Sequence, residues 1–266
     1  MTQSMDPICN DLQDETASLV ELLVGLSEDE WDRPTPAERW LVRDQVSHLA
    51  YFDETATLAA VDPDRFKASV SELTDRMAVD PNAVDVSIEQ GRQLSGSALL
   101  EWFTGARANM IDAFRQMEAK DRLPWYGPSM GARSFATARL METWAHGQDI
   151  VDALGLDRAP SDRLYHIAHI GNGARPYSYL VNGLDAPTEP ILVELKAPSG
   201  TIWTWGPDDA ANTVRGAALD FSLLVTQRRH RNDVDLDVVG DEANRWLSFA
   251  QAFAGPAGSG REPLTR

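Results

Sequence analysis

Apolar residues recur every three or four positions in four stretches of the first 155 residues, a spacing that puts them on one face of a helix. We therefore expect four amphipathic helices, over residues 6–27, 41–60, 95–119 and 132–154. Ser95 or Ser97 is the expected N-cap of the third helix, and Gly155 is the expected C-cap of the fourth. The intervening segment 62–94 is polar and acidic and predicts a short helix and a loop. Helices of this length predict a four-helix bundle.

The pattern changes near Pro160, where helical runs begin to mix with short runs rich in β-branched and aromatic residues. The expected strands cover residues 191–195, 201–205 and 234–239, and the expected helices cover 161–173, 214–227 and 243–254. The sequence thus predicts an α+β protein of two domains, a four-helix bundle over 1–158 and an α+β domain over 159–266. The second domain ends in an irregular, glycine-rich tail.

The charge of the chain limits its partners. The formal net charge is −17, from 24 basic and 41 acidic residues. Nucleic acids and anionic membranes both attract basic surfaces, so we expect neither as a partner. The sequence has no apolar stretch long enough to cross a membrane and only one cysteine, Cys9, so no internal disulfide can form. We expect a protein of the reducing cytoplasm.

Candidate metal ligands occur in two of the expected helices. Glu142 and His146 are four residues apart, which places them on one helix face, one turn from each other. His48, on the second expected helix, could complete a set of two imidazoles and a carboxylate. Three protein ligands and one open position are typical of a catalytic zinc site. The alternatives are a hydrogen-bonded histidine near the core for His48 and a helix-stabilising side-chain pair for Glu142 and His146.

Other residues could surround such a site. Asp149 follows His146 by three residues and could orient it through a hydrogen bond, or it could face solvent. Trp125 and Tyr126 lie in a turn-rich loop before the last bundle helix, where they could line a substrate pocket or pack under the loop. Arg175 could bind a substrate carboxylate or form a salt bridge.

The segment from Trp40 to His48, the Glu142–His146 pair and a bundle followed by a smaller α+β domain together resemble the DinB-like metal-binding family. The closer resemblance is to its branch of mycothiol-dependent maleylpyruvate isomerase, and residues 125–128 together with 140–149 look like an uncharacterised actinobacterial-type metal-binding subgroup of it. In that branch the C-terminal domain is related to the sterol carrier protein fold. The resemblance implies that His48, Glu142 and His146 hold a divalent metal, usually zinc, and that a low-molecular-weight thiol is the cofactor.

Such a ligand set suggests a reaction class. Two neutral imidazoles and one carboxylate leave a net charge of +1 on a dication, which favours an anionic fourth ligand, and a metal-bound thiol is deprotonated. We expect a zinc-dependent thiol transferase or isomerase that attacks a small electrophilic substrate with the thiolate of mycothiol or a similar thiol. A hydrolase that uses metal-bound hydroxide and a non-enzymatic metal- or small-ligand-binding protein are the alternatives. The pattern leaves open the substrate, the physiological metal and the oligomeric state.

Overall fold

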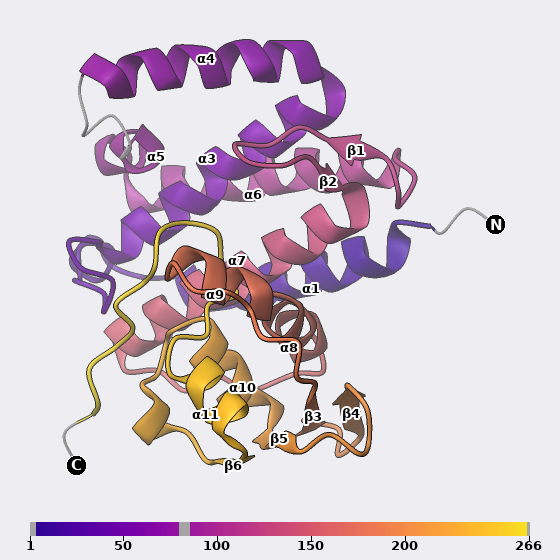
Figure 1. Ribbon diagram of the computed structural model, residues 1–266. Coiled ribbons are helices and arrows are strands. Elements are labelled where there is room, and N and C mark those ends of the chain that lie inside the picture. Colours follow the sequence, from indigo (N-terminus) through magenta and orange to yellow (C-terminus); the bar gives the residue numbers. More distant parts are fainter. Residues whose placement is uncertain (1–3, 80–85, 265–266) are drawn as a thin grey trace. The chain divides into compact units, whose positions relative to one another are not determined.

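A computed structural model describes residues 4–79 and 86–264 of the chain (Figure 1). The chain divides into two compact units, Met1–Asp157 and Arg158–Arg266, with the division one residue before the expected boundary. In the part that the structure describes, no helix is both long and apolar enough to cross a bilayer.

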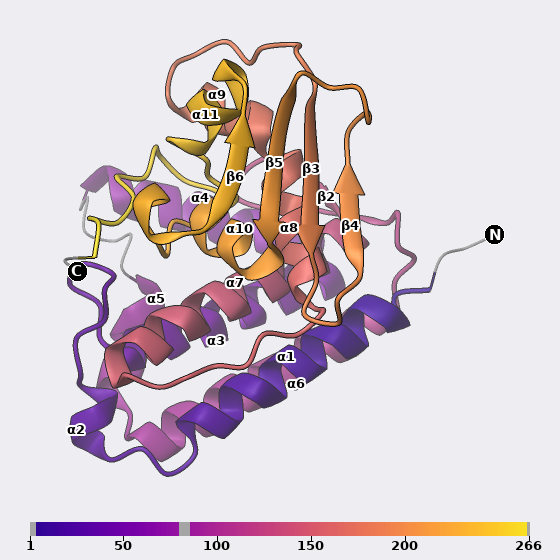
Figure 2. The same cartoon turned by 90° about the horizontal axis from the view of Figure 1, so that it is seen from below.

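The first unit is built around four long helices: α1 (Asp6–Leu23), α3 (Val42–Val61), α6 (Gly96–Arg115) and α7 (Ala132–Leu154). These helices lie nearly parallel to one another in Figure 2, where α1 and α3 each contact both α6 and α7. Their apolar faces enclose a core that includes Leu19, Val46, Leu49, Phe103 and Ile150. All four helices predicted from the apolar spacing are therefore present.

The ends of two of these helices show why the sequence pattern located them well. Ser95 caps α6 by accepting a hydrogen bond from the backbone N–H of Ala98. Gly155 ends α7 in the left-handed conformation, with φ of 65°, which glycine adopts without a steric penalty.

The segment between α3 and α6 differs from the prediction of a short helix and a loop. It contains the 17-residue helix α4 (Pro63–Val79), followed by α5 (Val86–Glu89) and a 3-10 turn (Gly91–Gln93). The Asp62 carboxylate accepts a hydrogen bond from the backbone N–H of Arg65, and Pro63 suits the first helical position because its missing N–H is not needed there. Phe66 is 1% exposed and anchors the helix, whereas most of its other described side chains are exposed or partly exposed.

The smaller elements of the first unit are α2 (Glu28–Trp31) and a short hairpin of β1 (Arg122–Leu123) and β2 (Met130–Gly131). The two strands are antiparallel, and the loop between them carries Trp125 and Tyr126. The hairpin is immediately followed by α7, so this loop is held next to the start of the helix that carries Glu142 and His146.

The second unit is a four-stranded sheet with helices packed on it. The strands are β3 (Ile191–Lys196), β4 (Ile202–Trp205), β5 (Asn212–Ala217) and β6 (Leu236–Val239). They lie side by side in the order β4-β3-β5-β6, with only the β3–β5 pair parallel (Figure 2). The helices are α8 (Leu164–Gly173), α9 (Arg175–Val181), α10 (Ala218–Val225) and α11 (Asp241–Leu247), and there is a 3-10 turn at Arg231–Asp233.

Two predictions for this unit were wrong in detail. Residues 214–227 were expected to form one helix, but 212–217 form β5 and only 218–225 form α10. Val214 pairs with Val193 of β3 inside the sheet, and both are fully buried. An apolar run with both faces covered has no alternation that distinguishes a strand from a helix.

The helix expected over 243–254 ends at Leu247, and α9 was not predicted. The α+β class, with a helical first unit and a sheet in the second, is confirmed.

Candidate functional site

His48 of α3 and His146 of α7 lie side by side where these two helices pack. Their ring centroids are 4.8 Å apart, and the ring planes are inclined by 46°. Both side chains are partly buried. The structure therefore brings together two of the three residues that the sequence proposes as metal ligands.

Aromatic rings surround this histidine pair. Trp40 stacks on His146 with a centroid distance of 5.9 Å and an angle of 12°, and it lies 5.1 Å from His48. Phe52, one helical turn after His48, contacts that ring at 4.6 Å. These rings reduce the contact of both imidazoles with water, which strengthens the electrostatic interactions that the imidazoles make.

Each imidazole uses its Nδ1 atom in a hydrogen bond. Nδ1 of His146 lies 2.6 Å from Oε1 of Gln45, and Nδ1 of His48 lies 3.2 Å from Oγ of Ser87. Histidine ligands of metals commonly use one ring nitrogen for such a supporting bond and the other for the metal. Nε2 is accordingly the candidate ligand atom of both rings.

Glu142 lies on the same face of α7 as His146, and its carboxylate forms an ion pair with Arg139. Arg139 is itself buried, and its guanidinium also donates to the carbonyl of Leu49 at 3.1 Å and to Asp53 at 2.8 Å. Burial lowers the pKa of Arg139, but the neighbouring carboxylates of Asp53 and Glu142 outweigh this effect and raise the pKa above its usual value. Arg139 is therefore a permanent cation that holds Glu142.

A polar network extends from Arg139 through the bundle core. Asp53 of α3 also accepts from Nε of Arg107 on α6 at 2.6 Å, and Arg107 donates to Oγ1 of Thr16 on α1 at 2.6 Å. Burial lowers the pKa of Arg107 against the opposing effect of Asp53. Each of the four long helices contributes at least one residue to this network, so the position of Glu142 depends on how the whole bundle packs.

The predicted metal triad is only partly assembled. Among residues 4–79 and 86–264, no three His, Cys, Asp or Glu side chains are grouped as a complete metal-binding cluster. His48 and His146 are adjacent, whereas the Glu142 carboxylate is directed to Arg139. A carboxylate has two oxygens and can bind a metal while one oxygen accepts a hydrogen bond. The donor chemistry of two imidazoles and a supported carboxylate fits a divalent metal such as zinc.

Trp125 and Tyr126 connect to the histidine pair through Phe52. Trp125 stacks on Phe66 of α4 at 5.7 Å, and Phe52 lies 6.0 Å from Trp125 and 5.8 Å from Tyr126. Tyr126 nevertheless remains 39% exposed. The two aromatic residues therefore pack inside the loop, and Tyr126 also forms part of the protein surface. Burial of the phenol raises the pKa of Tyr126 to about 12, which keeps it protonated at neutral pH.

The remaining predicted residues lie in different surroundings. Asp149 is 1% exposed, so the solvent-facing alternative is wrong for this side chain. Arg175 belongs to the second unit, where its guanidinium pairs with Glu242 at 2.7 Å and donates to the carbonyl of Glu189 at 2.8 Å. The structure therefore assigns to Arg175 the salt bridge that was its alternative, and its role in binding a substrate carboxylate stays a prediction.

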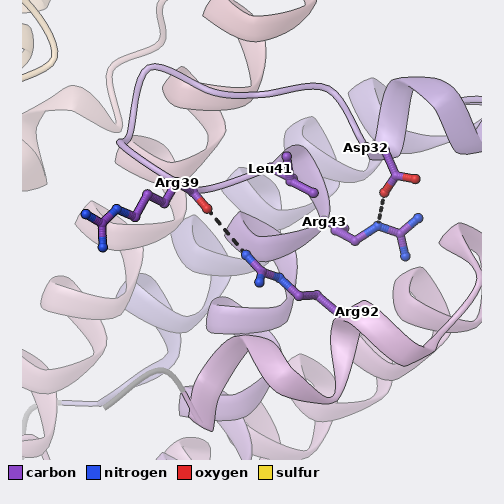
Figure 3. Close-up of a pocket in the computed structure, with 5 residues that line it drawn as sticks. All are labelled: Asp32, Arg39, Leu41, Arg43 and Arg92. Atoms are coloured by element: carbon purple, nitrogen blue, oxygen red, sulfur yellow. Dashed lines mark hydrogen bonds and ion pairs between the residues drawn. The ribbon is translucent and has the colours of Figure 1, made fainter. Parts of the chain in front are cut away.

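A pocket of about 460 Å³ lies beside the loop that carries Trp40, and its lining residues are Asp32, Arg39, Leu41, Arg43 and Arg92. Figure 3 shows Arg92 directed to the backbone carbonyl of Arg39, a contact of 3.3 Å, while the Arg39 guanidinium points away. Arg92 also pairs with the buried Asp44 at 2.8 Å. Arg39 has a left-handed backbone, with φ of 66°. These contacts hold the loop just before Trp40 rather than form an open cluster of cations.

Sequence reasoning missed Gln45, Ser87, Arg139 and the Asp53–Arg107 pair. Gln45 and Arg139 precede His48 and Glu142 by three residues, so helical spacing could have identified them. Asp53, Arg107 and Ser87 meet the site only through the packing of other elements, and no local pattern signals them.

Comparison with known proteins agrees with this architecture. Residues 12–151 match the family described as mycothiol maleylpyruvate isomerase N-terminal domain, and residues 187–237 match a shorter family described as wyosine base formation. Uncharacterised proteins from two strains of Mycobacterium tuberculosis, CDC 1551 / Oshkosh and ATCC 25618 / H37Rv, are each 44% identical over 256 residues, covering 96% of this chain and 98% of theirs.

Two solved structures share the fold. The crystal structure of the mycothiol-dependent maleylpyruvate isomerase matches with a TM-score of 0.58 at 17% identity, over 89% of this chain and 93% of that one. A histidine-to-alanine mutant of that enzyme matches over the same shares, with a TM-score of 0.57 at 16% identity. The extent of the family match and the 44% identity of full-length relatives lead to one conclusion: this chain belongs to the family of the mycothiol maleylpyruvate isomerase N-terminal domain.

Proposed function

We propose that this protein is a thiol-dependent isomerase or transferase that uses mycothiol, or a thiol of similar size, against a small electrophilic substrate. The observation that carries the proposal is the pair of adjacent imidazoles from α3 and α7, each supported through Nδ1. Membership of the mycothiol maleylpyruvate isomerase family supports the choice of thiol.

We further propose that His48, His146 and Glu142 hold a divalent metal, with zinc as the first candidate. A bound dication with this ligand set would lower the pKa of a thiol ligand and keep it as a thiolate at neutral pH. The carboxylate would lower the net charge of the bound dication to +1. This remaining positive charge favours one further, anionic ligand. The two imidazoles must be neutral to take part, so binding should weaken in acid.

Neighbouring residues have separate tasks in this proposal. Arg139 pairs with the Glu142 carboxylate and fixes its position, because Asp53 and Leu49 restrain the guanidinium. Trp40 and Phe52 contact the imidazole rings and reduce their exposure to water. Tyr126 keeps its phenolic proton at neutral pH and is partly exposed, so it could donate a hydrogen bond to an anionic substrate.

Elemental analysis of the purified protein tests the metal assignment. We expect about one divalent metal per chain in the wild type and a large loss in His48→Ala and His146→Ala. His166→Ala, a histidine of the second unit, is the matched control and should keep the wild-type content. Full metal content in both site variants would contradict the assignment. Metal without thiol binding would instead favour a hydroxide-based hydrolase or a non-enzymatic binding protein.

A further inference from the structure

A short chain of hydrogen bonds begins at a backbone carbonyl and ends at His146. The hydroxyl of Thr35 donates to the carbonyl of Trp40 at 2.9 Å. Nε2 of Gln45 donates to that hydroxyl at 2.9 Å, and Oε1 of Gln45 lies 2.6 Å from Nδ1 of His146. Gln45 is completely buried, so water does not compete for its amide.

The backbone carbonyl that accepts from Thr35 determines which atom donates and which accepts in each of these hydrogen bonds. A carbonyl oxygen can only accept, so the single proton of the Thr35 hydroxyl is donated to a backbone carbonyl, that of Trp40 at 2.9 Å or the more distant one of Ala37 at 3.5 Å. The hydroxyl must then accept from its other neighbour, and only the NH2 group of Gln45 can donate. This orients the amide so that its oxygen faces His146. An amide oxygen also only accepts, so Nδ1 of His146 must carry a proton.

From this polarity we infer that Gln45 is a positioning residue that holds His146 in its Nδ1-protonated tautomer, with the lone pair on Nε2. A neutral imidazole has one proton, so a proton on Nδ1 leaves Nε2 as an acceptor or metal ligand. The inference deepens the proposed function, because it assigns the atom by which His146 would act. It does not require a metal or a thiol to be bound.

The loop from Thr35 to Trp40 contributes to the position of His146 in two ways. The Trp40 carbonyl accepts from both the hydroxyl and the backbone N–H of Thr35, the latter at 2.8 Å. The side chain of Trp40 stacks on the ring of His146. The same residue therefore sets the direction of the hydrogen-bond chain and restrains the plane of the imidazole. Gln45 also lies one turn before His48, so the residue that bonds to His146 and the second histidine of the pair lie on one face of α3.

Long-range ¹H–¹⁵N correlation spectra of the full-length, metal-free protein with ¹⁵N-labelled histidine test the inference directly. Recorded at about pH 8.5, above the usual imidazole pKa of about 6.5, they should show His146 protonated at Nδ1. Gln45→Ala and Thr35→Val should each shift His146 towards the other tautomer or a mixture. Gln45→Glu, which can still accept from Nδ1–H, should retain the wild-type tautomer.

Gln148→Ala is the matched control, because Gln148 is on α7 and bonds to Asp152 rather than to a histidine. It should leave the His146 signals unchanged, and circular dichroism should show that every variant is folded. A wild-type His146 protonated at Nε2, or an unaltered tautomer in both Gln45→Ala and Thr35→Val, would overturn the inference.

Metal titration of the same variants separates this inference from the proposed function. If both hold, Gln45→Ala should weaken metal binding by about 10–100-fold, the usual effect of removing a residue that orients a ligand. If the tautomer changes while metal affinity does not, the positioning role of Gln45 stands and the assignment of His146 as a ligand fails.

Discussion

Asp53 and Arg139 join α3 to α7 by two hydrogen bonds, from Nε and Nη2 of the arginine to one carboxylate oxygen, at 3.1 Å and 2.8 Å. Both side chains are at most 3% exposed. The second oxygen of Asp53 accepts from Arg107, so one buried carboxylate compensates two buried guanidinium groups. The Arg139–Glu142 ion pair supplies the second negative charge of this network, so two carboxylates balance two guanidinium groups.

Neutralising Asp53 should therefore strongly destabilise the protein. Asp53→Asn leaves two guanidinium groups without a buried counter-charge, and we expect a loss of about 3–5 kcal/mol in the free energy of unfolding. Urea denaturation measures it. Asp64→Asn is the control, because Asp64 pairs with Lys67 at the surface and should cost at most about 1 kcal/mol. Equal effects of the two substitutions would show that the network does not stabilise the bundle.

Cys9 should make the stability fall in alkaline solution. Burial raises the pKa of its thiol to about 11 in the folded state, above the ordinary value of 9.0. The folded state therefore holds its proton where the unfolded state has lost it. The stabilisation that comes from keeping this thiol protonated is complete below pH 9.0. It is lost as the pH rises to about 11, which lowers the free energy of unfolding by at most about 2–3 kcal/mol.

The alkaline effect can be measured by urea denaturation between pH 8 and 11, with Cys9→Ala as the comparison. The variant should lose less stability over this range than the wild type does. The phenols of Tyr126 and Tyr179, whose pKa values are raised from 10.0 to about 12, also lower the stability from about pH 10 upward, but they are present in both proteins and cancel in the comparison. Parallel curves would show that the thiol titrates at its ordinary pKa.

A fragment of residues 1–158 should fold without the second unit. All four long helices, the core that they enclose and the three proposed metal ligands lie before residue 158. Circular dichroism should show a helical protein with a cooperative thermal transition, and elemental analysis should show that it retains metal. A fragment that is insoluble or only partly folded would mean that the two units share a core.

Helical spacing was a sufficient guide to the bundle because its signal is local. Glu142 and His146 are one turn apart whatever the rest of the fold is, and Ser95 and Gly155 mark helix ends by their own chemistry. The resemblance connected His48 to this pair, and helix packing places the two histidine rings in contact. Arg139 pairs with Glu142 from three residues earlier in α7, a contact that the same helical spacing could have indicated.

The errors arose where local patterns are weak. Phe66 is the fully buried aromatic anchor of α4, and the apolar residues that follow it at helical spacing, Val70, Leu73 and Met77, are obscured by the polar and acidic residues between them. Val214 lies in a strand whose register depends on β3, more than fifteen residues earlier in the chain. The contact between Asp53 and Arg107 depends on the relative rotation of two helices, and the sequence pattern specifies which face is buried but not which residues meet.

The central claim is that the histidine pair forms a site for a metal and a thiol, and a thiol titration of the cobalt-substituted protein tests it most directly. Binding of a thiolate to cobalt produces an intense near-ultraviolet charge-transfer band. We predict that mycothiol produces this band in the wild type and in His166→Ala, and that His48→Ala and His146→Ala abolish it. Absence of the band at millimolar mycothiol in the wild type, or its persistence in both site variants, would contradict the claim.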